Sequence, residues 1–136
     1  MARVRIESTL GPTRRRTISG LLAFNIRAVG KGHYKSLVIS LRQGKDIVGG
    51  LTGWTWAGWC YVELLWIEEK HRGKGHGTAL IRKAESEARK RGVKNMYLDT
   101  FSFQAPQFYR KLGFKAFGKL KDFPKGHDRT WFKKAL

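Results

Sequence analysis

The sequence predicts an α/β (α+β) fold built on a mixed β-sheet. Segments with the alternating pattern of strands and segments with helical periodicity follow one another along the 136 residues. One strongly amphipathic helical stretch, residues 76–91, lies in the middle, and glycine-rich turns separate the segments. Strands with helices between them form a sheet covered by helices. The length is typical of one domain, so we expect a single domain over residues 1–136.

The N-terminal half is expected to contain mainly strands. Residues 3–9 alternate apolar and polar side chains, which predicts a strand that Gly11 and Pro12 end. Residues 13–28 have apolar side chains near helical spacing and predict one or two short helices. Further strands are expected over residues 36–43, 47–57 and 59–67.

The C-terminal half starts with the helix predicted over residues 76–91. Its apolar stripe includes Leu80 and Ala84, whereas Glu85 and Arg89 form an i,i+4 pair that we expect on the solvent face. The remaining elements are a strand at 96–98, a short helix at 104–112 and strands at 114–120 and 130–134.

The chain is strongly basic, with 28 Lys and Arg against 10 Asp and Glu and a net charge of +18. The basic residues are spread over the whole chain, which favours encounters with polyanions and weak, salt-sensitive binding to nucleic acid. No nucleic-acid-binding motif is present, so we expect nucleic acid to bind only non-specifically. No apolar run approaches the roughly 20 residues of a membrane span, and Cys60 is the single cysteine. These features predict a cytoplasmic protein that does not bind a membrane.

The run Arg72-Gly73-Lys74-Gly75-His76-Gly77 predicts an anion site, because it joins a strand to the start of a helix. Glycines let the backbone approach a ligand closely. The first helical turn has free N–H groups and a positive dipole end, which together bind phosphate.

The spacing separates three classes of phosphate loop. A mononucleotide P-loop needs Ser or Thr directly after Gly-Lys, but Gly75 follows Lys74. A dinucleotide loop needs a third glycine where Thr78 stands, and an acidic residue further on that is missing. The remaining pattern, R-x-x-G-x-G with Arg72, Gly75 and Gly77, resembles the pyrophosphate loop of the GNAT superfamily of acyl-CoA N-acyltransferases.

A second segment, residues 98–114, resembles the other GNAT signature, A-x-x-[FL]-Y-x-K-x-G-[FY]. The matching residues are Ala105, Phe108, Tyr109, Lys111, Gly113 and Phe114. One departure is Ser102, which stands where the family often has an Asn that bonds the cofactor chain. The resemblance implies a GNAT fold with about six or seven strands, flanking helices and splayed central strands.

The resemblance also implies which residues bind acetyl-CoA. The backbone of Leu65, Trp66 and Ile67 would pair with the pantetheine arm and polarise the thioester carbonyl. The remaining cofactor-binding positions are Arg72, Gly73, Lys74, Gly75, His76, Gly77, Thr78, Ser102, Ala105 and Phe108. No metal is expected.

Two residues are candidates for catalysis. The resemblance places Tyr109 beside the sulfur, and a phenol is protonated at neutral pH, so Tyr109 is the candidate general acid. Glu63 lies in an otherwise apolar strand, where burial would raise its pKa, and is the candidate general base. His127, His33 or a water molecule are alternatives for the base.

The expected function is transfer of an acetyl group from acetyl-CoA to a primary amine by direct attack in a ternary complex. A small-molecule acceptor is favoured over a protein. The alternatives are acetylation of a protein or nucleic-acid-bound substrate, and a nucleic-acid-associated protein that uses the fold as a scaffold. The sequence leaves open whether the chain forms a homodimer.

Overall fold

The computed structural model describes residues 1–136, which divide into two compact units, Met1–Gly32 and His33–Leu136. The first unit contains one helix, α1 (Gly11–Val29), and residues 1–10 form no helix or strand. The strand predicted over residues 3–9 is therefore wrong. Its alternating pattern is not enough, because a strand also needs a neighbour to pair with its backbone groups. No helix has the length and apolar content that a membrane span needs.

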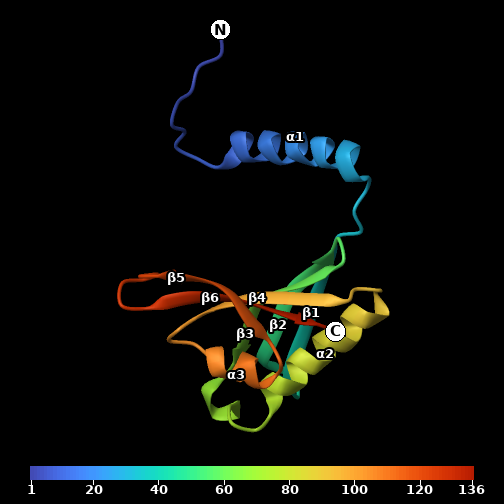
Figure 1. The fold of residues 1–136 in the computed structure, drawn as a ribbon, viewed down its shortest axis with the longest axis vertical. Coiled ribbons are helices and arrows are strands. Elements are labelled where there is room, and N and C mark those ends of the chain that lie inside the picture. Colours follow the sequence, from blue (N-terminus) through green and yellow to red (C-terminus); the bar gives the residue numbers. More distant parts are fainter. The chain divides into compact units, whose positions relative to one another are not determined.

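The second unit is a six-stranded sheet with helices, as Figure 1 shows. In chain order its elements are β1 (Lys35–Gln43), β2 (Asp46–Trp56), β3 (Trp59–Ile67), a 3-10 turn η1 (Glu69–His71), α2 (His76–Lys90), β4 (Asn95–Phe101), α3 (Pro106–Lys111), β5 (Lys115–Lys121) and β6 (Asp128–Ala135). The strand order is β1-β2-β3-β4-β6-β5. Only β3 and β4 pair in parallel. The predicted α/β class with a mixed sheet is confirmed.

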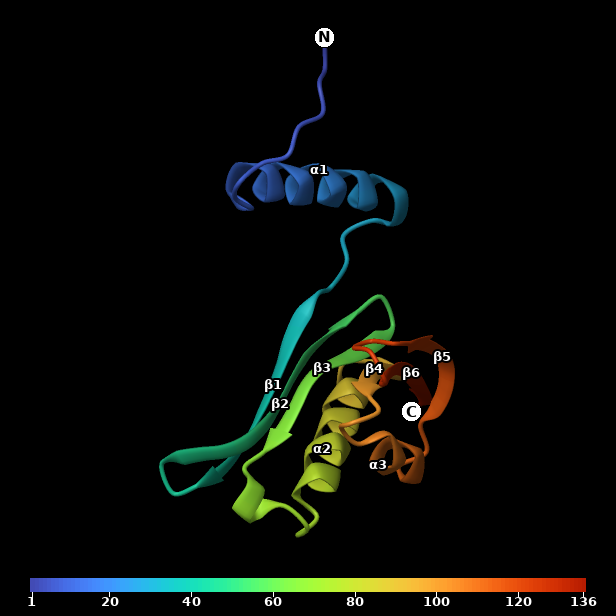
Figure 2. The same cartoon turned by 90° about the vertical axis from the view of Figure 1, so that its left-hand side faces the viewer.

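The core lies between one face of the sheet and the two helices α2 and α3. Ile81 of α2, Tyr109 of α3 and Phe132 of β6 belong to one buried cluster, so both helices pack on the same face. Figure 2 shows β1, β2 and β3 side by side, with α2 next to β3 and β4. Within residues 33–136, the opposite face of the sheet carries no helix.

Glu85 of α2 is part of this packed layer, so its predicted place on the solvent face is wrong. Its side chain is only 2% exposed and is bound by Lys134 Nζ at 2.9 Å and Arg82 Nη1 at 3.1 Å. Arg89 is a third, longer partner at 3.6 Å. Helical spacing placed the Glu85–Arg89 pair correctly, but it could not reveal that Lys134, from β6, neutralises the carboxylate inside the core.

The two central strands separate after a short parallel ladder. Pairing between β3 and β4 runs from Trp59 with Asn95 to Val62 with Leu98 and then ends. β3 continues along β2 to Ile67, and β4 continues along β6 to Phe101. The sheet therefore forks between β3 and β4, as expected for splayed central strands, and the fork positions the candidate site.

Candidate active site

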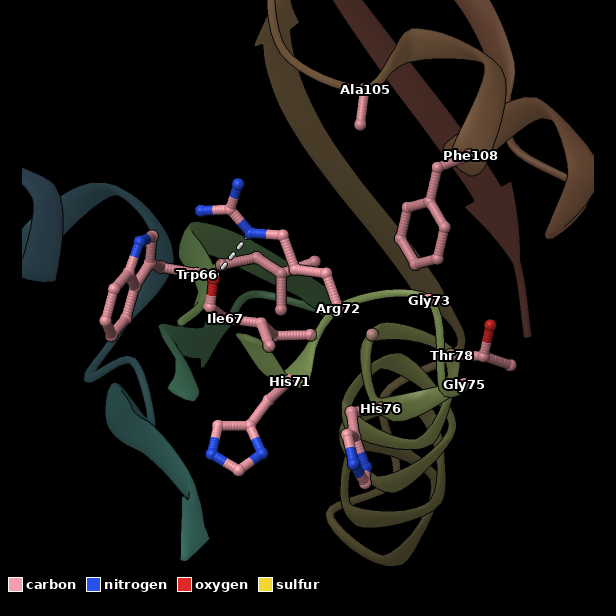
Figure 3. A pocket seen from close by; sticks show the side chains of 12 residues that line it. Trp66, Ile67, His71, Arg72, Gly73, Gly75, His76, Thr78, Ala105 and Phe108 are labelled. Atoms are coloured by element: carbon pink, nitrogen blue, oxygen red, sulfur yellow. Dashed lines mark hydrogen bonds between the residues drawn. The ribbon is translucent and has the colours of Figure 1, made fainter. Parts of the chain in front are cut away.

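Two adjoining cavities lie along the fork and the loop before α2. The first, of about 450 Å³, extends to the glycine loop, and Figure 3 shows its lining. The second, of about 710 Å³, extends into the fork and is lined by Glu63 and Tyr109. The residues common to both are Leu65, Trp66, Ile67, Arg72, Ala105 and Phe108. The two cavities therefore form one continuous site with a loop end and a fork end.

The loop end is built for an anion. Gly73 and Gly75 adopt positive φ angles of 73° and 82°, a conformation that side chains disfavour. α2 starts at His76, no side chain caps it, and its first turn has no acidic residue. The N–H groups of His76, Gly77 and Thr78 precede the first intrahelical donor and have no partner within the helix. These residues line the cavity, so free donors and the positive helix end face it.

Arg72 is fixed where β3 meets this loop. Its Nε donates to the carbonyl oxygen of Ile67 at 2.8 Å, the dashed line in Figure 3. The remaining guanidinium nitrogens have no partner within the chain. The side chain lines both cavities, so its charge lies where they join.

The main chain of β3 offers free groups to the fork. The N–H of Glu68 donates to Val48 of β2. Because antiparallel hydrogen bonds alternate along a strand, Trp66 also turns its main-chain groups to β2. Leu65 and Ile67 turn theirs to the open side. Trp66 also lines the cavities, and its side chain is exposed.

Glu63 lies at a bulge of β3. Thr52 of β2 is opposite Leu64 and Gly53 is opposite Val62, so Glu63 is the additional residue. β2 approaches β3 closely at this bulge because Gly53 has no side chain. A Cβ at Gly53 would overlap the carbonyl of Tyr61. Glu63 is exposed and its Oε2 accepts a hydrogen bond of 3.3 Å from Thr52. The expected burial of this carboxylate is therefore wrong, because the bulge turns it out of the apolar row.

Tyr109, on α3, reaches the same cavity from the other side. Its side chain is 7% exposed and packs against the rings of Phe108 and Phe114. Burial, with a smaller contribution from the negative charge of Asp99, raises the pKa of Tyr109 to about 12. The phenol therefore keeps its proton throughout the physiological range.

Asp99 follows Leu98, the last residue of β4 that pairs with β3, and so marks the point of the fork. Arg129 donates to Asp99 Oδ1 at 2.7 Å, and the hydroxyl of Tyr61 donates to Oδ2 at 2.9 Å. Burial and this hydrogen bond to Asp99 raise the pKa of Tyr61 to about 12. The network ties β3, β4 and β6 together where the ladder ends.

Two predicted cofactor-binding residues do not line either cavity. Lys74 is exposed on the loop. Ser102 instead joins the loop between β5 and β6, because its hydroxyl accepts from the N–H of Asp128 at 3.0 Å and lies 3.3 Å from His127 Nδ1. His127 also packs against the ring of Phe103. All the other predicted site residues line at least one of the two cavities.

The structure adds residues that the sequence did not indicate, above all Gln104. Its Oε1 accepts from the N–H of Phe101 at 2.9 Å and from Thr100 at 3.2 Å. A backbone N–H needs an acceptor, so the amide NH₂ must point away from it, and Gln104 lines the fork cavity. In the sequence, only its place directly before Ala105 of the second signature could have indicated Gln104 as a site residue. Phe103, Thr100 and His71 also line the cavities, and the His71 Nε2 atom is buried without a partner.

Comparison with known proteins agrees with this geometry. Residues 10–114 match the model of the acetyltransferase (GNAT) family. The chain is 38% identical to an acetyltransferase of Agrobacterium fabrum over 115 residues, which is 84% of each protein. It is also 38% identical to the blasticidin-S acetyltransferase of Streptomyces morookaense over 82 residues, or 60% of each.

Solved structures show the same fold. A crystal structure of an Agrobacterium tumefaciens acetyltransferase matches with a TM-score of 0.92 and 34% identity over the full length of both chains. A streptothricin acetyltransferase of Bacillus anthracis, solved with acetyl coenzyme A, matches with a TM-score of 0.66 and 20% identity over 74% of this chain and 62% of that one. The family match, the long relative and the forked sheet agree, and the chain belongs to the acetyltransferase (GNAT) family.

Proposed function

We propose that the protein transfers the acetyl group of acetyl-CoA to a primary amine, by direct attack within a ternary complex. The observation that carries the proposal is the continuous site along the fork. An anion-binding loop forms one end, and Tyr109 and Glu63 line the other. Acetyl-CoA fits this arrangement, because its thioester and its diphosphate lie at opposite ends of a long arm.

The loop end holds the substrate. The free N–H groups of the first turn of α2 bind the pyrophosphate, and Arg72 adds charge beside it. The free main-chain groups of Leu65 and Ile67 pair with the amides of the pantetheine arm. A backbone N–H of this stretch polarises the thioester carbonyl. Gln104 donates its fixed amide NH₂ to the same arm, a role that Ser102 cannot take from its place beside His127.

The fork end carries the chemistry. Glu63 accepts a proton from the attacking amine, directly or through a water molecule, because its exposed carboxylate lines the cavity. The amine attacks the thioester carbon, and the C–S bond breaks. Tyr109 donates a hydrogen bond to the departing sulfur. Since the pKa of Tyr109 is about 12, its contribution is to stabilise the thiolate rather than to protonate it fully.

Direct attack is favoured over an acyl-enzyme by the state of Cys60. The side chain is fully buried. Burial raises the pKa of its thiol from 9.0 to about 11, so the nucleophilic thiolate is scarce at neutral pH. Cys60 also lines neither cavity.

For the acceptor we favour a small-molecule amine. Two relatives are named for the small molecules they acetylate, blasticidin S and streptothricin. The fork cavity, at about 710 Å³, lies within the range of pockets that take small ligands.

A screen of amines with acetyl-CoA tests the proposal. Thiol release and the mass of the product are measured together, since hydrolysis alone also releases thiol. We expect an N-acetylated product and initial-velocity lines that intersect when both substrates are varied. Parallel lines would contradict direct transfer, and acetyl-CoA binding that is undetectable by calorimetry would contradict the whole proposal.

A further inference from the structure

A third cavity lies at the opposite end of the β3–β4 ladder from the fork. Its volume is about 580 Å³, and it is lined by Trp59, Asn95, Gly113, Lys115, Lys133, Lys134 and Ala135. None of these residues lines the two cavities of the candidate active site. Three of them are lysines and none is acidic, so the cavity is positively charged.

Two of the lysines have no acidic partner, although the amine of Lys133 lies 5.7 Å from the centre of the Phe117 ring. Lys115 of β5 and Lys133 of β6 are directly opposite in the antiparallel ladder, and like charges in that position repel. Neither forms an ion pair, whereas Lys134 is bound to Glu85 at 2.9 Å. An anion between Lys115 and Lys133 would relieve the repulsion.

An aromatic platform adjoins the lysines. Trp59 is 39% exposed, and its ring is held edge-on against Tyr97 at 5.8 Å. Tyr97 is itself opposite Lys133 in the next ladder. Two aromatic rings, from β3 and β4, are therefore followed by two lysines, from β6 and β5, on the face of the sheet that neither α2 nor α3 covers.

We propose that this surface binds single-stranded nucleic acid without sequence preference. Lys115 and Lys133 bind phosphates, and a base stacks on Trp59, the combination by which single strands are bound generally. The cavity has room for a nucleotide unit. The net charge of +18 strengthens the attraction.

The test is binding of a fluorescent short oligothymidine, followed by anisotropy over a range of salt concentrations. The double variant Lys115→Gln/Lys133→Gln should bind more weakly, and its slope of log affinity against log salt should be shallower by about 0.7 for each lost phosphate contact. Lys83→Gln/Lys90→Gln is the matched control, because it removes the same charge from exposed positions of α2. Its salt slope should change little.

Stacking is tested at the tryptophans. Trp59→Ala should weaken binding about tenfold or more, whereas Trp66→Ala, at an exposed ring that lines the active-site cavities instead, should have a small effect. Melting temperature and acetyl-CoA affinity should stay unchanged in the lysine variants, which separates this site from the proposed catalytic function. Equal losses in both lysine pairs would reduce the effect to net charge and overturn the proposal. Equally tight binding of duplex DNA, or of free thymidine monophosphate, would also overturn it.

Discussion

Gly77 and Phe108 depend on each other. A Cβ atom on Gly77 would lie 3.1 Å from Cζ and 3.3 Å from Cε1 of Phe108, closer than side chains normally pack. The glycine of the loop therefore lets the ring from α3 close one side of the cavity that both residues line. Through this contact the first turn of α2 and the second signature segment form a single site.

The first prediction follows from that contact. Gly77→Leu should displace Phe108 into the cavity and lower acetyl-CoA affinity by at least about tenfold, measured by calorimetry. Gly118→Val is the control, because nothing lies within 4 Å of a Cβ there and its φ is not positive. Wild-type affinity in Gly77→Leu, with the fold intact by circular dichroism, would refute the loop as the pyrophosphate site.

A second prediction concerns Glu63. If it is the base, Glu63→Gln should lower kcat by about 10²–10⁴-fold and leave acetyl-CoA affinity unchanged. Thr52→Val, which removes only the 3.3 Å hydrogen bond to the carboxylate, should have a much smaller effect. Steady-state rates give kcat and calorimetry gives the acetyl-CoA affinity, both measured on the same preparations of each variant. A Glu63→Gln enzyme with full turnover would leave a histidine or water as the base.

The third prediction is a pH profile. Because the pKa of Tyr109 is about 12, the phenol stays protonated up to about pH 11, and its ionisation should produce no fall in kcat below that pH. Tyr109→Phe should lower kcat more than acetyl-CoA affinity at every pH, since it removes the proposed hydrogen bond to the sulfur. A loss of wild-type activity near pH 9 that Tyr109→Phe abolishes would contradict the raised pKa.

The sequence predicts correctly those features that depend on residues close together in the chain. The glycine loop and the helix after it are local features, written into residues 72–91 in the order in which they fold. The fork was implied by the resemblance and is confirmed by the ladder that ends at Val62 and Leu98. Both succeed because glycine conformation and helical periodicity act over a few residues.

The features that the sequence predicts wrongly or does not reveal depend on contacts with other parts of the chain. Residues 3–9 have the pattern of a strand but no partner, and Glu63 occurs in an apolar sequence but at a bulge that turns it outward. The orientation of Gln104 depends on a hydrogen bond from Phe101 across a turn. Pairing, bulges and side-chain orientation are set by contacts that periodicity does not encode.

A fourth prediction concerns alkaline stability. Burial raises the pKa of Cys60 from 9.0 to about 11 and that of Tyr109 from 10.0 to about 12. The folded state thus holds these protons more tightly than the unfolded state. This stabilisation is complete below pH 9 and is lost as pH rises towards 12. The free energy of unfolding, from urea titrations, should fall above pH 9. Cys60→Ala should make the fall between pH 9 and 10 shallower, and an unchanged slope would contradict the Cys60 assignment.

The last prediction concerns Glu85, the only acidic side chain among the buried residues. Glu85→Ala leaves the amine of Lys134, which is 16% exposed, without its carboxylate inside the packed layer between α2 and β6. Removing one partner of a buried ion pair costs about 3–5 kcal/mol, so the urea midpoint should fall sharply. Glu68→Ala breaks an exposed pair with Lys70 and should cost about 1 kcal/mol or less. The double variant Glu85→Met/Lys134→Met should recover most of the loss, because two apolar side chains replace the pair without leaving a charge. If the double variant is no more stable than Glu85→Ala, the loss arises from packing of the helix rather than from the unpaired lysine.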